Sequence, residues 1–129
     1  MAYTLPDAEK NYLADQQAAR VTHFSIHTAD PGTTGASEAT GGGYARVASN
    51  FAAAGAAGPL GATLQPATPG VAWGSMTPTV AAGTYTHTGG WSASSAGTFR
   101  GGGSLSASIV MGAGGATPAI SVKVGPGVS

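Results

Sequence analysis

The chain has 129 residues with 22 glycines, 8 prolines, no cysteine, and five basic and five acidic side chains that give a net charge of zero. This length suits one domain with a real core, and the missing cysteines exclude disulfides and thiolate metal sites. The neutral balance argues against nucleic acid or an anionic membrane as a partner, because both select basic patches.

The start of the chain, "MAYTLPDAEK", lacks the basic and apolar regions of a secretory signal. No apolar run approaches the roughly 20 residues that span a bilayer. We therefore expect a soluble protein made in a reducing cytoplasm. Its glycine content is far above the usual level of about 7%. A sheet protein with many tight turns explains this better than disorder, which normally combines low hydrophobicity with high net charge.

The first predicted element is a helix over about residues 6–19, in a glycine-free stretch, residues 1–20, that holds half of the charged side chains. Leu5, Ala8 and Tyr12 recur at helical spacing and form one thin apolar stripe. A helix this short is marginal on its own in water. We therefore expect residues 1–20 to form an N-terminal arm whose helix docks by that stripe on the β-domain or on a neighbouring chain.

After the helix the period of the sequence changes to two. In "VTHFSIHT", residues 21–28, Phe24 and Ile26 share one face. The opposite face holds three polar side chains: His23, Ser25 and His27. This alternation predicts a half-buried strand with the polar face outward.

Further short strands are predicted at 44–51, 62–70, 83–88, 96–100, 103–111 and 118–124. Six or seven short strands between Gly/Pro turns predict a mainly β fold with a short N-terminal helix. The architecture is then a single small β-sandwich, jelly-roll-like or Ig-like, or a barrel. The predicted domain is 21–129, with a long Gly-rich loop at 29–43.

The three histidines do not form a convincing metal site. His23 and His27 lie on one face of a strand but about 13 Å apart, whereas ligands lie about 2 Å from a shared metal ion. His87 can neighbour one of them across a sheet, which gives two ligands at best. We predict neither a metal nor another cofactor.

Catalytic motifs are missing as well. No G-x-S-x-G elbow occurs, and "GWSAS" comes nearest. The acidic residues beyond the helix are Asp30 and Glu38, both in the long loop. Asp30 precedes Pro-Gly and suits turn chemistry, while Glu38 is expected to pair with Arg46 or with a neighbouring subunit. The glycine runs lack the Lys-Ser/Thr of a phosphate-binding loop. We therefore expect no catalytic residues and no enzyme.

The aromatic residues allow one binding hypothesis. Trp73, Trp91 and Tyr85 would make a sugar-binding platform if their rings were exposed. The interpretation we favour is that Trp91 and Phe99 are core or interface anchors.

Two longer stretches, "FSIHTADPGTTGASEATGGGYARVASNF" and "YTHTGGWSASSAGTFRGGGSLSASI", resemble a family of small tailed-phage virion proteins, often labelled tail fibre or minor structural proteins. The matching segments run in the family's order: Thr28 to Pro31, Gly35 to Glu38, Gly41 to Arg46, Thr86 to Trp91, and Gly101 to Leu105. The hairpin after Trp91 departs from it, reading "SASSAG" where an Asp-Ala-x-x-Gly-Gly turn is commoner.

The resemblance implies a β-sandwich and a role in virion assembly. We expect a non-enzymatic structural protein of the tail, a small tail fibre or minor tail protein, assembled in the host cytoplasm into the virion. The expected partners are further copies of the chain, as a homo-oligomer, and other phage structural proteins. The alternative is a head decoration protein on the major capsid protein, and the second alternative is the host-surface carbohydrate-binding module.

The long loop is the predicted interface. Ordering each residue costs roughly 1–2 kcal/mol, more for glycine, and the few apolar atoms of "ADPGTTGASEATGGG" cannot offset that within one small domain. We therefore expect residues 29–43 to be ordered against another chain, with Tyr44 and Arg46 anchoring the loop's exit. The candidate interface residues are Asp30, Pro31, Glu38, Gly41, Gly42, Gly43, Tyr44, Arg46, Trp91 and Arg100.

Overall fold

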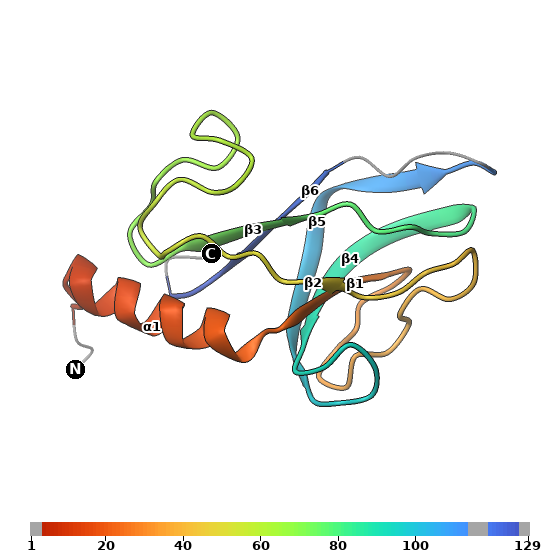
Figure 1. The fold of residues 1–129 in the computed structure, drawn as a ribbon, viewed down its shortest axis with the longest axis horizontal. Helices are drawn as coiled ribbons and strands as arrows, with labels where there is room; N and C mark the ends of the chain where they lie inside the picture. The colour runs from red at the N-terminus through yellow and green to blue at the C-terminus, as the bar shows by residue number, and fades with distance from the viewer. Residues whose placement is uncertain (1–3, 114–118, 127–129) are drawn as a thin grey trace. The chain divides into compact units, whose positions relative to one another are not determined.

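A computed structural model describes residues 4–113 and 119–126, which contain one helix and six strands (Figure 1). The elements are α1 (Asp7–Arg20), β1 (His23–His27), β2 (Val47–Ala48), β3 (Ala72–Met76), β4 (Gly83–Trp91), β5 (Phe99–Met111) and β6 (Ile120–Val124). They belong to two compact units. The helix unit comprises the described parts of 1–20, 50–75 and 121–129, and the sheet unit comprises those of 21–49 and 76–120.

The sheet unit is built on one four-stranded sheet with the order β2-β1-β4-β5. Each neighbouring pair is antiparallel, and β1 pairs along its whole length with β4, from His23 opposite Trp91 to His27 opposite His87. Phe24 and Ile26 of β1 are completely buried. This strand is therefore the centre of the unit's core, as the sequence predicted for its apolar face.

The polar face of β1 is buried too, so the predicted half-buried strand is wrong. Ser25 and His27 are 0% exposed, like the apolar residues between them. Alternation of polar and apolar residues predicts an outward polar face only when those polar groups lack partners inside the protein. Both side chains have such partners, which are described with the candidate site below.

Strand β5 replaces two predicted strands, 96–100 and 103–111. The triple glycine that suggested a turn lies inside the strand, where Gly101 has φ of 129°. The ladder pairs Trp91 with Phe99 and Gly90 with Gly101, so Arg100 is an extra residue on β5. Such a bulge lets a strand continue through an irregular conformation that glycine tolerates.

Other strand predictions had mixed outcomes. The strand predicted at 83–88 exists and runs on to Trp91, whereas 44–51 contributes only the two residues of β2. The strand predicted at 62–70 is wrong, because that segment forms turns. Strand β3 was not predicted, since a short buried run without alternation gives no period.

The last predicted strand, 118–124, corresponds to β6, and its first residue lies outside the described residues. Its side chains alternate as predicted: Ile120, Val122 and Val124 are more buried than Ser121 and Lys123. β6 pairs with β3 in a two-stranded sheet. The mainly β class with a short helix is thus confirmed. Both sheets formed by the described residues are open, so they do not form the alternative barrel.

Helix α1 packs within the helix unit through polar groups and the fully buried Ala14 rather than through the predicted apolar stripe. The Asn11 Oδ1 atom accepts the Gly70 N–H at 2.8 Å, and the Asp15 Oδ1 atom accepts the Ala54 N–H at 2.8 Å. Tyr12, a member of the stripe, is 58% exposed. The stripe prediction is wrong because these side chains dock the helix by satisfying loop main chain. The division into a 1–20 arm and a 21–129 domain stays a prediction.

Gln65 is the buried polar centre of the helix unit. Its Oε1 atom accepts the Leu60 N–H at 2.8 Å, and its Nε2 atom donates to the Gly74 carbonyl and the Ser121 hydroxyl, both at 2.8 Å. The side chain is 0% exposed. One amide therefore joins a loop turn to β3 and β6, which explains why 62–70 closes on itself instead of forming a strand.

Replacing Gln65 with leucine should destabilise the protein by about 3 kcal/mol, because it leaves buried donors and acceptors without partners. Urea unfolding followed by circular dichroism measures the loss. The matched control is Gln17→Leu, the same change on an exposed position of α1. This control should stay within about 0.5 kcal/mol of the parent, and an equal loss in both variants would contradict the assigned role of Gln65.

Candidate functional site

The long loop of residues 29–43 folds back on β1. The Thr28 N–H donates to the Ser37 carbonyl at 3.0 Å, and the Ala39 N–H donates to the Ile26 carbonyl at 2.9 Å. These main-chain bonds continue the sheet pattern into the loop. The first part of the loop therefore has hydrogen-bond partners within its own unit, and its contact with another chain stays a prediction.

The turn at the start of the loop forms as the sequence predicted. The Gly32 N–H donates to Asp30 Oδ1 at 2.9 Å, and Gly32 has φ of 61°. Pro31 is buried, and its carbonyl accepts the N–H groups of Gly35 and Ala36. The turn role of Asp30 is confirmed; Pro31 is buried within this chain, and its place in an interface stays a prediction.

Glu38 and the two residues at the loop's exit form an ion-pair cluster. Arg46 donates from Nε to Glu38 Oε2 at 2.8 Å and from Nη2 to Oε1 at 2.9 Å, and the Tyr44 hydroxyl donates to Oε2 at 2.9 Å. A two-pronged arginine-carboxylate pair is among the stronger polar contacts in proteins. The predicted pairing of Glu38 with Arg46 is confirmed, and so is the anchoring of the loop's exit.

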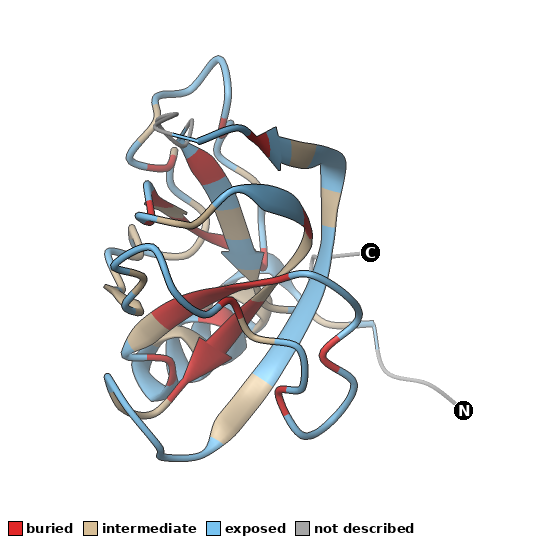
Figure 2. Ribbon diagram, turned by 90° about the vertical axis from the view of Figure 1, so that its right-hand side faces the viewer, coloured by how far each residue is buried: buried red, intermediate tan, exposed pale blue. Residues whose placement is uncertain are grey.

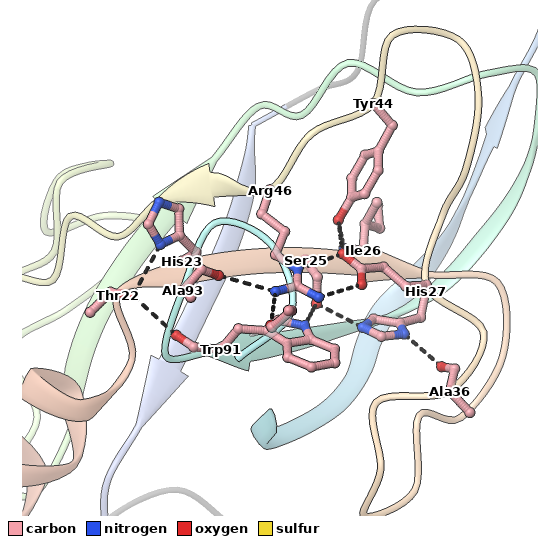
Figure 3. Close-up of polar contacts among 12 residues, drawn as sticks. Thr22, His23, Ser25, Ile26, His27, Ala36, Tyr44, Arg46, Trp91 and Ala93 are labelled. Atoms are coloured by element: carbon pink, nitrogen blue, oxygen red, sulfur yellow. Dashed lines mark hydrogen bonds and ion pairs between the residues drawn. The ribbon is translucent and has the colours of Figure 1, made fainter. Parts of the chain in front are cut away.

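Arg46 also holds the turn that follows β4. Its Nη1 atom donates to the carbonyls of Ala93 and Ala96 at 3.0 and 2.8 Å, and its guanidinium carbon lies 3.6 Å from the ring centroid of Trp91. Figure 3 shows the guanidinium over the indole, with its bond to the Ala93 carbonyl. One side chain therefore joins the long loop, the strand end and the next turn by charge, hydrogen bonds and cation–π contact.

Trp91 continues this network into the core (Figure 3). Its Nε1–H donates to Ser25 Oγ at 2.9 Å, and Ser25 Oγ lies 2.7 Å from His27 Nε2. His27 Nδ1 lies 2.8 Å from the Ala36 carbonyl, which can only accept. His27 therefore carries its proton on Nδ1, and Ser25 donates to Nε2. Phe99 packs edge-on against Trp91, with ring centroids 5.1 Å apart.

A serine next to a histidine is also the arrangement of a nucleophile and its base. Here both side chains are 0% exposed, and the Ser25 oxygen already accepts the Trp91 N–H. The other histidine nitrogen faces a main-chain carbonyl instead of a carboxylate. A substrate has no access to this pair, so its hydrogen bonds order the core.

The charges of the cluster are tuned by burial and by their partners. Burial lowers the pKa of His27, against the opposing effect of its bond to the Ala36 carbonyl. Burial alone would raise the pKa of Glu38, but the hydrogen bonds from Arg46 and Tyr44 outweigh it and lower that pKa. Burial and the bond to Glu38 raise the pKa of Tyr44 far above its usual range. The fold therefore favours neutral His27, ionised Glu38 and neutral Tyr44.

The family model described as "Podophage GP4 fiber I protein gp80" matches residues 10–123. The chain belongs to this fibre protein family. Neither a curated protein nor a solved structure shows significant similarity to it. The match spans the ion-pair cluster, the long loop and most of both units.

Stability of this fibre-family chain should fall on both sides of neutral pH. His27 prefers the neutral form, so its contribution is complete above its usual pKa of 6.5 and is lost as pH falls below that value. Glu38 prefers the ionised form in the folded protein, so the free energy of unfolding falls again as the pH drops below its usual pKa of 4.5. Tyr44 prefers the neutral form in the folded protein, so the free energy of unfolding falls as the pH rises above its usual pKa of 10.0.

Urea unfolding in buffers from about pH 3 to pH 8 measures the two acid steps. In His27→Gln the loss that begins near pH 6.5 should disappear, whereas the loss below pH 4.5 should remain. A parent protein whose free energy of unfolding is constant from pH 8 to pH 5 would contradict the assignment to His27.

The structure gathers only part of the predicted interface set. Glu38, Tyr44, Arg46 and Trp91 meet in the cluster. The remaining predicted residues do not join it. Asp30 and the three glycines 41–43 are exposed. Arg100 lies on β5, and its Nε atom is buried without a hydrogen-bond partner in the part of the chain that the structure describes. Sequence reasoning missed the inward roles of Ser25 and His27.

The aromatic platform for sugars is not present. Trp73, Trp91 and Tyr85 are only 9%, 8% and 3% exposed. The Trp73 Nε1–H donates to the Pro66 carbonyl, and the Lys123 ammonium lies 5.3 Å from the Trp73 ring centroid. The carbohydrate-binding alternative needed exposed rings, and their burial overturns it. The interpretation of Trp91 as a core anchor is confirmed.

His27 and His87 do neighbour each other across the sheet, as expected for one histidine pair. Within 4–113 and 119–126, no three His, Cys, Asp or Glu side chains lie close enough together to hold a metal ion. The same residues contain no helix that is long and apolar enough to cross a membrane.

Proposed function

We propose that the protein is a non-enzymatic structural subunit of a podophage tail fibre and assembles by protein–protein contacts within the virion. The observation that carries this proposal is the family match over residues 10–123, which leaves only short ends of the chain unmatched. Its partners are further copies of the chain and other structural proteins of the tail.

The charged and titratable side chains near the long loop bond to groups of the same chain, which supports a structural role. Glu38 and Arg46 bind each other, and His27 is occupied by Ser25 and a main-chain carbonyl. Glu38, Arg46 and His27 thus hold the loop in place. The exposed tip of the loop, residues 40–43, is one threonine and three glycines, so a partner there has to pair main-chain groups to offset their desolvation.

The exposed tip of the long loop is the part that we assign to a partner contact. Residues 40–43 are exposed, and the Tyr44 N–H closes a turn onto the Gly41 carbonyl at 3.0 Å. Tyr44 and Arg46 then fix the chain behind this tip through Glu38. The tip is therefore presented on a rigid base, which lowers the entropy cost of binding.

Localisation in purified particles tests the proposal. Mass spectrometry should detect the protein in washed virions, and gold-labelled antibodies against it should decorate the tail in electron micrographs. Label over the capsid would instead support head decoration. Absence from intact particles, with the other virion proteins detected, would overturn a structural role altogether.

A further inference from the structure

The two edges of the four-stranded sheet differ greatly in length. Strand β2 closes one edge with only two residues, whereas β5 forms the other edge with 13 residues. Most of β5 is exposed, as the pale blue strand along one side of Figure 2 shows. Short edge strands are a common protection against strand addition, and only the β2 edge has it.

The outer edge of β5 carries unpaired main-chain groups. In an antiparallel sheet, alternate residues direct their N–H and C=O groups to one neighbour or to the other side. β4 pairs with 101–104 and again with 109–111, while the four residues between them, 105–108, lie opposite Thr86 alone. No strand among the described residues pairs with the outer side of β5.

From Gly101 to Met111, β5 carries no side chain that protects an edge; its irregularities are the bulge at Arg100 and the stretch 105–108 opposite Thr86. From Gly101 to Met111 it reads "GGGSLSASIVM", without a charge or a proline. Natural edge strands that must stay single usually carry lysine, proline or an inward charge. A stretch of 11 neutral residues leaves the row of main-chain groups open to another extended strand.

We propose that the outer edge of β5 pairs with β5 of a second copy of this chain, antiparallel about a twofold axis. The edge is neutral, so it offers nothing that selects a charged partner. Pairing with the opposite edge of another copy would engage only the two residues of β2. A β5–β5 contact joins two edges of equal length and is self-complementary, as a twofold interface requires.

The proposal deepens the proposed function, because it rests on a fibre subunit that meets other copies of itself. It adds the surface and the symmetry of that contact. The two sheets become one continuous sheet across two protomers. Main-chain N–H and C=O groups of 101–108 that bond to water in the free protomer then bond to β5 of the other copy.

A pair of lysines on β5 tests the contact. Ser106→Lys with Ser108→Lys brings four positive charges together in the paired state, and both serines are exposed in one protomer. Sedimentation velocity should show at least a tenfold rise in the dimer dissociation constant. The matched control is Ser94→Lys with Ser95→Lys, the same chemical change at exposed positions of the turn before β5. It should leave the constant within twofold.

Disulfide trapping locates the contact directly, since the chain has no cysteine of its own. Single cysteines are placed at Ser104, Ser106 and Ser108, with Ser95→Cys as the control. Around a twofold axis, one β5 position lies opposite its own copy and should crosslink fastest, because a disulfide needs Cα atoms within about 7 Å. Equal crosslinking at all positions, the control included, would indicate random collisions and overturn the proposal.

The outcomes separate this inference from the proposed function. A parent protein that stays monomeric at high concentration and forms no crosslink, yet is found in the tail by antibody labelling, overturns the β5 contact alone. A dimer that the β5 lysines do not weaken also overturns it. A β5-paired dimer that is absent from virions would leave the contact standing and overturn the structural role.

Discussion

Replacing Arg46 with methionine should destabilise the sheet unit by about 4 kcal/mol, the range found when one partner of a buried ion pair is removed. Methionine keeps much of the side-chain volume but removes every donor. Glu38, whose side chain is only 21% exposed, then loses both bonds from the guanidinium. The carbonyls of Ala93 and Ala96 lose their donor as well.

Chemical denaturation of Arg46→Met measures this loss, with Arg20→Met as the matched control at the exposed end of α1. The control should cost less than about 1 kcal/mol. The double variant Glu38→Gln with Arg46→Met should cost much less than the sum of the two single changes, because the residues act as a pair. Additive losses would contradict the cluster as one interacting unit.

Gly35→Ala should be equally damaging, with a loss of about 4 kcal/mol, because a backbone strain and an overpacked core add together. Gly35 has φ of 80°, and a Cβ atom there would press into the Trp91 ring and lie 3.0 Å from Phe99. The ring cannot retreat easily, since its N–H is bonded to Ser25. The loop would have to lift from the core.

Gly32→Ala is the control for this change. Gly32 lies in the same loop and has φ of 61°, but a Cβ atom there meets nothing within 4 Å. It should cost about 1–2 kcal/mol from the left-handed backbone alone. Thermal unfolding measures the melting temperature of the two variants. An equal decrease in both would show that the close approach of residue 35 to Trp91 does not contribute to the loss.

The features predictable from sequence were those fixed by neighbours in the chain. The Asp30 turn is predictable because Asp, Pro and Gly follow one another there. The Glu38–Arg46 pair is predictable because Glu38 is the only acidic residue close in sequence to the arginine at the loop's exit. The alternation in β6 also needed nothing beyond local period. Each of these depends on residues within about ten positions of one another.

The features that failed depend on partners far along the chain. Ser25 looks like an outward residue until Trp91, 66 positions later, donates to it. Asn11 and Gln65 likewise find their partners 59 and 56 positions away, which no spacing rule reveals. The triple glycine of β5 suggested a turn because its pairing with β4 is visible only in three dimensions.

The distribution of the two tryptophans gives the molecule its own optical probes. The chain has only Trp73 and Trp91, and each compact unit holds one of them in a buried setting. Trp91 lies beneath a guanidinium, whereas Trp73 lies beside an ammonium and donates to a carbonyl. Fluorescence of Trp73→Phe and Trp91→Phe therefore follows one unit at a time, and coincident or separate melting curves reveal whether the two units unfold cooperatively.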